Sequence, residues 1–132
     1  IIMSTRKVNT IQDALGNNPS TAAQLKQGRA KAWVTFNVQS TGTNKTIRSS
    51  YNVDSVTDIA TGRFGINFTD EALADANYSF SGNICNDNST MATSINVQGD
   101  GDFSTSTLDI RCVSPSNSTN DGFTTCITVH GN

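Results

Sequence analysis

Arg29-Ala-Lys-Ala-Trp-Val-Thr-Phe-Asn37 is the stretch that decides the fold class, because its residues alternate in character with a period of two. Ala32, Val34 and Phe36 are apolar, and Trp33 lies between the first two. Successive side chains of a β-strand point to opposite faces, so this alternation predicts a strand with one buried face. It also places Trp33 on the face opposite the core.

The same period recurs along most of the chain. Apolar residues alternate in five further series: Phe64, Ile66 and Phe68; Tyr78, Phe80 and Ile84; Ile95 and Val97; Leu108, Ile110 and Cys112; Phe123, Thr125, Ile127 and Val129. Clusters of turn-forming residues separate these series: Ser40–Asn44, Ala60–Gly62, Asn86–Ser89, Gly99–Asp102 and Ser114–Gly122. The pattern predicts an all-β fold, an antiparallel β-sandwich of about eight strands across residues 30–130. Thr69–Ala74 fits a single helical turn at a sheet corner.

The alternation also predicts which side chains fill the core. These residues are Val34, Phe36, Ile66, Phe68, Tyr78, Phe80, Ile95, Leu108, Ile110 and Ile127. A domain of 132 residues buries roughly two-thirds of the surface that its unfolded chain exposes. We therefore expect this core to hold without a metal ion or a disulfide.

Residues 1–28 differ from the rest of the chain and form a short, partly helical N-terminal arm in our interpretation. Val8, Ile11 and Leu15 are spaced three and four residues apart, which is typical of a helix face. Ser20 is a candidate N-cap for a second short helix, Thr21–Gln27, which carries Leu25. Helical turns this short are not stable alone, so they either pack on something else or remain mobile. We expect their apolar side chains to lie in a groove of a partner.

The domain organisation follows from this change of period. Residues 1–28 are predicted to be an attachment arm, and residues 29–132 a single β domain. Met3, followed by the small Ser4, is typical of a natural start, which leaves open whether Ile1 and Ile2 belong to the natural protein. No apolar segment follows Arg6 and Lys7, so a signal peptide is not predicted.

The composition disfavours several classes of partner. Only 15% of the residues are charged, the formal net charge is −2, and the nine basic residues are scattered. Nucleic-acid binding needs clustered cations that displace counterions from the phosphates, so no nucleic acid is expected. No apolar run approaches the roughly 20 residues of a membrane span, so no membrane insertion is expected.

The sequence lacks a set of residues for catalysis, and we expect that the protein is not an enzyme and has no cofactor. The chain has one histidine, His130, which stands near its C-terminal end with no second histidine to activate a cysteine. Asp100 and Asp102 flank a glycine and are typical of a hairpin, since the later acidic ligands of a calcium loop are missing. No catalytic, cofactor-binding or metal-binding residue is therefore predicted.

The three cysteines, Cys85, Cys112 and Cys126, have no zinc-ligand spacing, and an odd number leaves at least one thiol unpaired within the chain. We expect them to be reduced and buried as small apolar residues.

Trp33 allows two interpretations, because it is a large aromatic residue on the outward face of a strand. The first is a contact surface under the arm or at a boundary between subunits. The second is a platform on which a sugar ring stacks at a receptor-binding surface. Its place in the middle of a strand rather than on a loop favours the first.

Four segments resemble the β domain of bacteriophage tail fibres and related virion appendages. They are Arg29–Asn37, Ile47–Asp58, Gly62–Thr69 and Asp75–Ser79, the last of which opens with Asp75-Ala-Asn-Tyr78. Their order and spacing match the family over about residues 29–83. The family often has a proline before its Asp-Ala-Asn-Tyr motif, whereas this chain has Ala74. The motif is structural and implies no catalytic residue.

The resemblance implies a virion structural protein, assembled in the host cytoplasm and trimeric as fibres usually are. The first expected function is a short tail or head fibre, whose arm docks on another virion protein. Its β domain would then face a glycan or protein of the host cell surface. The alternative is a capsid-decorating (cement) protein that stabilises the shell without binding a receptor. A carbohydrate-binding module outside viruses is a third and more distant reading.

Overall fold

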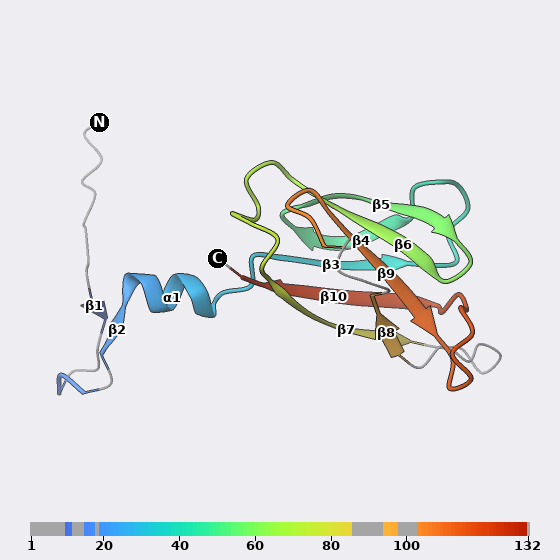
Figure 1. Ribbon diagram of the computed structural model, residues 1–132. Helices are drawn as coiled ribbons and strands as arrows, with labels where there is room; N and C mark the ends of the chain where they lie inside the picture. Colours follow the sequence, from blue (N-terminus) through green and yellow to red (C-terminus); the bar gives the residue numbers. More distant parts are fainter. Residues whose placement is uncertain (1–9, 12–14, 18, 86–93, 98–102, 132) are drawn as a thin grey trace.

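The computed structural model describes residues 10–11, 15–17, 19–85, 94–97 and 103–131, and it is predominantly β with antiparallel sheets. Two four-stranded sheets make up the bulk of these residues (Figure 1). The β3 sheet has the strand order β4-β3-β10-β7, and the β6 sheet has the order β5-β6-β9-β8. Their strands are β3 (Ala32–Asn37), β4 (Thr46–Tyr51), β5 (Val53–Ala60), β6 (Arg63–Phe68), β7 (Ser79–Cys85), β8 (Ser94–Asn96), β9 (Thr107–Val113) and β10 (Thr124–His130).

One apolar cluster contains the inward side chains of both sheets. The rings of Phe36 on β3 and Phe64 on β6 meet edge to face, with their centroids 5.4 Å apart. Of the predicted core residues, seven are buried: Val34, Phe36, Ile66, Phe68, Leu108, Ile110 and Ile127. The other three, Tyr78, Phe80 and Ile95, are only partly buried and pack against the cluster. Phe80 and Ile95 lie on β7 and β8, which are edge strands and therefore have less protein around them.

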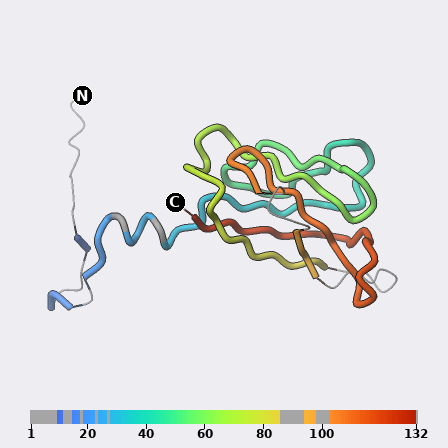
Figure 2. The backbone as a smooth tube through the Cα atoms, viewed as in Figure 1, coloured from blue at the N-terminus to red at the C-terminus, as the bar shows by residue number. Residues whose placement is uncertain are grey.

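The described part of the arm extends away from the two sheets (Figures 1 and 2). Its elements are β1 (Thr10–Ile11), β2 (Ser20–Thr21) and α1 (Ala22–Gly28), and β1 pairs with β2. The prediction of a helical turn through Ile11 is wrong, because Thr10 and Ile11 pair with Thr21 and Ser20 instead. A single turn of helix makes few backbone hydrogen bonds for the residues that it orders, so a short antiparallel pair replaces it at little cost.

The second predicted helix, Thr21–Gln27, corresponds to α1 with its start moved by one residue. Thr21, and not Ser20, is the N-cap. Its hydroxyl accepts a hydrogen bond from the backbone N–H of Gln24, and the Gln24 side chain accepts one from the backbone N–H of Thr21. This reciprocal capping box satisfies two N–H groups that the first turn leaves without helical partners. None of the described helices is long and apolar enough to cross a membrane.

A bulge in β4 decides which way its aromatic residue points. Thr35 lies opposite Ser49, whereas the next residue, Phe36, lies opposite Ile47, so Arg48 is an extra residue in the ladder. One extra residue inverts the alternation of the strand beyond it. As a result Ile47 packs against the core, while Tyr51 points outward.

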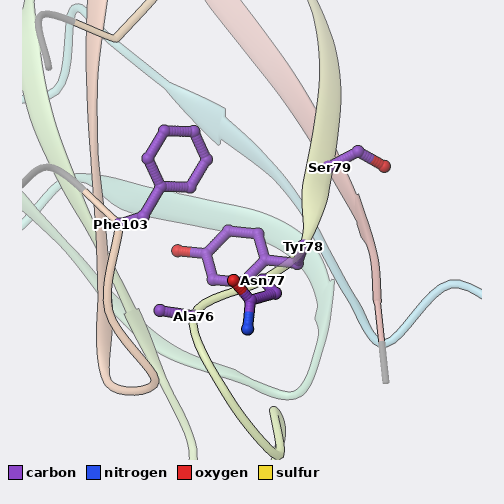
Figure 3. Close-up of a pocket in the computed structure, with 5 residues that line it drawn as sticks. All are labelled: Ala76, Asn77, Tyr78, Ser79 and Phe103. Atoms are coloured by element: carbon purple, nitrogen blue, oxygen red, sulfur yellow. The ribbon is translucent and has the colours of Figure 1, made fainter. Parts of the chain in front are cut away.

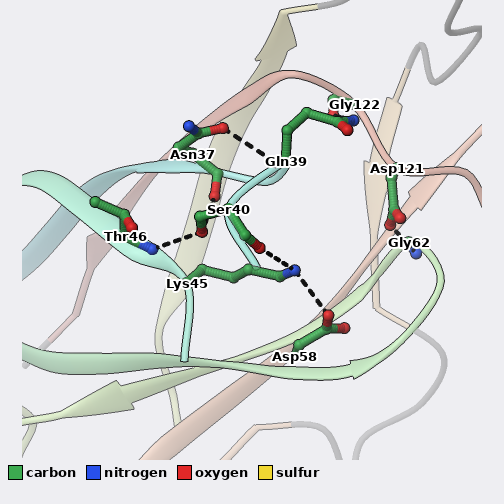
Figure 4. Close-up of polar contacts among 9 residues, drawn as sticks. All are labelled: Asn37, Gln39, Ser40, Lys45, Thr46, Asp58, Gly62, Asp121 and Gly122. Atoms are coloured by element: carbon green, nitrogen blue, oxygen red, sulfur yellow. Dashed lines mark hydrogen bonds and ion pairs between the residues drawn. The ribbon is translucent and has the colours of Figure 1, made fainter. Parts of the chain in front are cut away.

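A partly buried ion pair ties the loop before β4 to the opposite sheet (Figure 4). The Lys45 ammonium lies 2.7 Å from the Asp58 carboxylate on β5 and donates to the carbonyl oxygen of Ser40 at 3.0 Å. Backbone hydrogen bonds from Lys45 to Val56 and from Asp58 to Thr43 flank the pair. This contact fastens a loop of the β3 sheet to the edge of the β6 sheet.

Gly62 occupies the turn between β5 and β6, where no other residue fits. Its φ angle is +66°, and a Cβ atom there would lie 2.6 Å from the backbone nitrogen of Asn120. The Gly62 N–H donates to the Asp121 carboxylate at 2.7 Å (Figure 4). The turn is therefore locked against the loop that leads into β10.

Candidate binding surface

An aromatic groove opens where the arm meets the β3 sheet. Trp33 and Tyr51 lie directly opposite each other on β3 and β4. Together with Arg29 and Ala30 they line a hollow of about 260 Å³, which we call the Trp33 groove. Trp33 is 36% exposed and Tyr51 48% exposed, so the alternation places Trp33 outward as predicted. Exposed aromatic pairs of this size are characteristic of surfaces that bind a partner.

The Trp33 groove continues onto the arm. A second hollow, also of about 260 Å³, is lined by Ala22, Leu25, Lys26 and Arg29. Arg29 belongs to both hollows, so an apolar strip runs from α1 to Tyr51 with this arginine at its middle. The structure thus brings two predicted site residues, Leu25 and Trp33, onto neighbouring parts of one surface.

Ile11 and Leu15 of the arm line neither of these two hollows, but they are exposed as Leu25 is. Ile11 is 56% exposed, Leu15 is 86% exposed and Leu25 is 40% exposed. Val8, the remaining predicted arm residue, lies outside the described residues. The exposed apolar side chains of the arm are thus presented on two-residue strands, a turn and a seven-residue helix.

The charges are segregated around the Trp33 groove. Neither α1 nor any of the four strands of the β3 sheet contains an aspartate or a glutamate. The exposed cations here are Lys26 on α1, Arg29 between α1 and β3, and Arg48 on β4. Arg29 forms no ion pair among the described residues. The groove therefore favours a partner that carries negative charge.

Carboxylates gather in a turn at the same end of the domain. Asp70, Glu71 and Asp75 follow β6 within six residues, and the first two are exposed. The helical turn predicted at Thr69–Ala74 is wrong, because Glu71 has a φ angle of +62°, which a right-handed helix does not admit. We refer to residues 69–75 as the acidic turn.

Backbone and apolar contacts hold the acidic turn in place. The Ala72 N–H donates to the Thr69 carbonyl, and the Thr69 N–H donates to the Asn52 carbonyl, each at 3.2 Å. Ala72 and Leu73 are buried in the core cluster. The turn is thus anchored on both sides of Glu71, whose side chain is left at the surface.

A further hollow, of about 620 Å³, lies at the start of β7 (Figure 3). It is lined by Ala76, Asn77, Tyr78, Ser79 and Phe103. The Tyr78 hydroxyl donates to the Ser104 carbonyl at 3.1 Å, and burial raises the pKa of this hydroxyl. The Tyr78 hydroxyl is thus engaged within the fold. The hollow therefore presents the aromatic rings of Tyr78 and Phe103 rather than a free hydroxyl.

The cysteines differ from one another in environment. Cys112 is buried, and burial raises the pKa of its thiol to about 11, so it is a neutral thiol near pH 7. Cys85 and Cys126 are exposed, so the expectation that all three are buried is wrong for these two. Both lie on the outward face of the β3 sheet, where alternation on β7 and β10 places them.

The described residues hold no cluster of three or more His, Cys, Asp or Glu side chains suited to a metal ion. Asp100 and Asp102, discussed above as a hairpin, lie outside the described residues. His130 ends β10 opposite Ser79, whose hydroxyl donates to the His130 carbonyl at 3.4 Å. The non-enzymatic interpretation stays a prediction.

Sequence reasoning missed Tyr51 as a partner of Trp33. The register of β4 hides it, because Ile47 and Tyr51 are four residues apart and would share a face in a regular strand. Reasoning from sequence recognised Arg29 as the first residue of the stretch Arg29–Asn37, and not as part of a groove. A signal was present in the charge pattern, because Ala22–Asn37 lacks any carboxylate.

Comparison with known proteins adds no relative: no family model, curated protein or solved structure matches the chain.

Proposed function

We propose that the protein is a bacteriophage virion appendage, a short tail or head fibre that attaches the particle to its host. In this proposal residues 29–132 form an eight-stranded antiparallel β-sandwich, and residues 1–28 form a partly helical arm that docks on another virion protein. The observation that carries the proposal is the exposure of Ile11, Leu15 and Leu25 on elements too short to be stable alone. Such a segment gains order by laying its apolar side chains into a groove of a partner.

The opposite end of the β domain is suited to face the host. The loops after β3, β5 and β9 all lie at the end away from the arm, because β3 starts at the arm and its neighbours are antiparallel. Two of these loops, Ser40–Asn44 and Ser114–Gly122, consist largely of small polar residues. Loops on a rigid sheet scaffold are a common location for a recognition surface, here for a host glycan or protein.

The proposed assembly is a homotrimer with Trp33 at the boundary between subunits. Trp33 and Tyr51 expose a pair of large rings on a regular sheet face, and burial of such rings favours association. The protein is proposed to be structural rather than enzymatic, to need no cofactor, and to reside in the virion.

Deletion of residues 1–28 tests the proposal most directly. We expect the remaining chain to fold, with the β-type circular dichroism of the full chain, and to be missing from purified virions. A second variant, in which Ile11, Leu15 and Leu25 are changed to Ser, keeps the arm's length and removes these three apolar side chains. We expect this variant to incorporate poorly into virions. Normal incorporation of both variants would refute arm docking.

Electron cryomicroscopy of the particle then locates the protein. Density projecting from the tail or head, with the loop end outermost, agrees with a fibre. Density lying flat across capsid subunits would instead identify a capsid-decorating protein.

A further inference from the structure

We infer that the Trp33 groove of one chain receives the acidic turn of a second copy of the same chain. The inference rests on the proposed function, because it names the partner of the proposed subunit boundary. It also specifies that two different surfaces meet, with Arg29 of one copy opposite Asp70 and Glu71 of the next.

Charge complementarity identifies the occupant. The residues that line the groove and the strands of the β3 sheet include no carboxylate, whereas Asp70, Glu71 and Asp75 lie within six residues of one another. Within one chain Glu71 lines a hollow with Lys26 and Lys31 but forms no ion pair with either, so Arg29 is the groove cation left for a second copy. Neither Asp70 nor Glu71 forms an ion pair within the described part of the chain, and neither does Arg29. Each chain therefore carries two exposed surfaces of opposite charge, and in a ring one neighbouring copy supplies the complement of the groove while another supplies the complement of the turn.

The position of the two surfaces favours a closed ring. Tyr51 ends β4, and the acidic turn starts next to Asn52, because the Thr69 N–H donates to the Asn52 carbonyl. Groove and turn thus lie at the same end of the domain, beside the arm. The groove belongs to the β3 sheet and the turn to the β6 sheet. Copies that contact one another through two different surfaces form a ring when the rotation between neighbours closes. They form a helical filament when each contact also shifts the next copy along the axis. Because the groove and the turn lie at the same end of the domain, the arrangement favours a ring.

The acidic turn is also rigid enough to enter the Trp33 groove of another copy in a fixed conformation. Ala72 and Leu73 fix it to the core, and Glu71 adopts a left-handed conformation that is unusual for a residue with a side chain. Unusual backbone conformations that the surroundings enforce tend to occur at functional positions. A preformed insert loses little conformational entropy when it binds.

Charge reversal tests this inference in the full-length protein. Sedimentation velocity at low and high salt gives the mass, for which we expect three times the chain mass of 14.0 kDa in the wild type. Arg29→Glu and Glu71→Arg should each weaken association by about tenfold or more. The double variant restores the opposite charges and should regain the wild-type mass. Arg63→Glu, on β6 at the far end of the domain, is the matched control and should remain trimeric.

The fluorescence of Trp33, the one tryptophan of the chain, reports on the groove itself. Its emission should shift to longer wavelength in the two single variants and return in the double variant. If charge reversal disturbs folding, as judged by circular dichroism, Arg29→Gln and Glu71→Gln replace it, and each should weaken association to a smaller degree.

Three results would overturn the inference. They are a monomeric wild type, single variants that associate as tightly as the wild type, and a double variant that stays dissociated although folded. Quenching of Trp33 in the assembled wild type by poly-glutamate or polygalacturonate would also overturn it, since the groove would then be open to another ligand. A dissociated Glu71→Arg chain that still enters virions would leave arm docking intact, so the two proposals fail separately.

Discussion

Trp33 and Tyr51 face each other across β3 and β4, and both rings point away from the core. Their pairing depends on the bulge at Arg48, which turns Tyr51 to the outer face while Ile47 remains inside. A local irregularity of one residue thus converts a sheet face covered by small polar side chains into one with an aromatic groove.

Phe36→Ala should destabilise the protein by about 3–5 kcal/mol, because Phe36 is fully buried and contacts the Phe64 ring. Chemical denaturation with circular dichroism gives the free energy of unfolding. Thr35→Ala, one residue earlier and pointing outward, is the control and should cost less than about 1 kcal/mol. Equal losses for the two variants would show that the assignment of the inward face is wrong.

Lys45→Met should lower the free energy of unfolding by about 1–3 kcal/mol. The change leaves Asp58 without its ion pair in a partly buried position, although Asp58 retains some access to water. Arg48→Met is the matched control, since Arg48 is exposed and forms no ion pair among the described residues. A Lys45→Met protein as stable as the control would mean that the loop before β4 is held by its backbone contacts alone.

Stability should fall at alkaline pH because of Cys112. Burial raises the pKa of its thiol from 9.0 to about 11, so the native state binds this proton more tightly than the unfolded state does. The protonated Cys112 thiol therefore makes its full contribution to the free energy of unfolding below about pH 9. This contribution is lost as the pH rises through 11, by about 2–3 kcal/mol in all. In Cys112→Ala this part of the pH dependence is absent.

The measurement is the difference in free energy of unfolding between wild type and Cys112→Ala at pH 8 and at pH 10.5. We expect this difference to shrink at the higher pH. Tyr78, whose pKa is also raised, is present in both proteins and cancels. A difference that is constant with pH would show that Cys112 is not desolvated.

Reducing agent and chelator should each leave the melting temperature unchanged to within about 2 °C. The three cysteines are thiols in the structure, and the apolar cluster of the two sheets supplies the core. Differential scanning calorimetry with dithiothreitol, and separately with EDTA, checks this. A fall of several degrees with EDTA would point to a structural metal ion, and one with dithiothreitol to a disulfide between chains.

Sequence reasoning predicts the fold class and the core residues best where the strands are regular. β3 and β10 alternate without interruption, and β6 and β9 depart from alternation only at Gly65 and Val113, so the period of two identified the β class and most of the core. The prediction failed where the ladder contains a bulge. In β5 the buried residues Val53 and Val56 are three apart, because the register shifts between Val53 and Ser55, and no alternation marks this strand.

The surface was predicted only in part, for a related reason. Single residues such as Trp33 and Leu25 are recognisable as exposed apolar side chains from local spacing. The residues that lie next to them in the fold are not recognisable in this way. Tyr51 lies opposite Trp33 because of the strand register, which local sequence spacing does not encode. The left-handed Glu71 was equally hidden, since neither glycine nor asparagine marks the position.

The attachment point of the arm has a mechanical consequence. The arm enters the domain through β3, which is hydrogen-bonded on one side to β4 and on the other to β10. Tension transmitted along the arm would therefore load two backbone ladders at once and in shear, so that many hydrogen bonds must break together rather than one after another. An edge strand in the same position would peel away bond by bond. A particle held to a cell by this domain would thus be tethered through one of the strands of the fold that is hardest to extract.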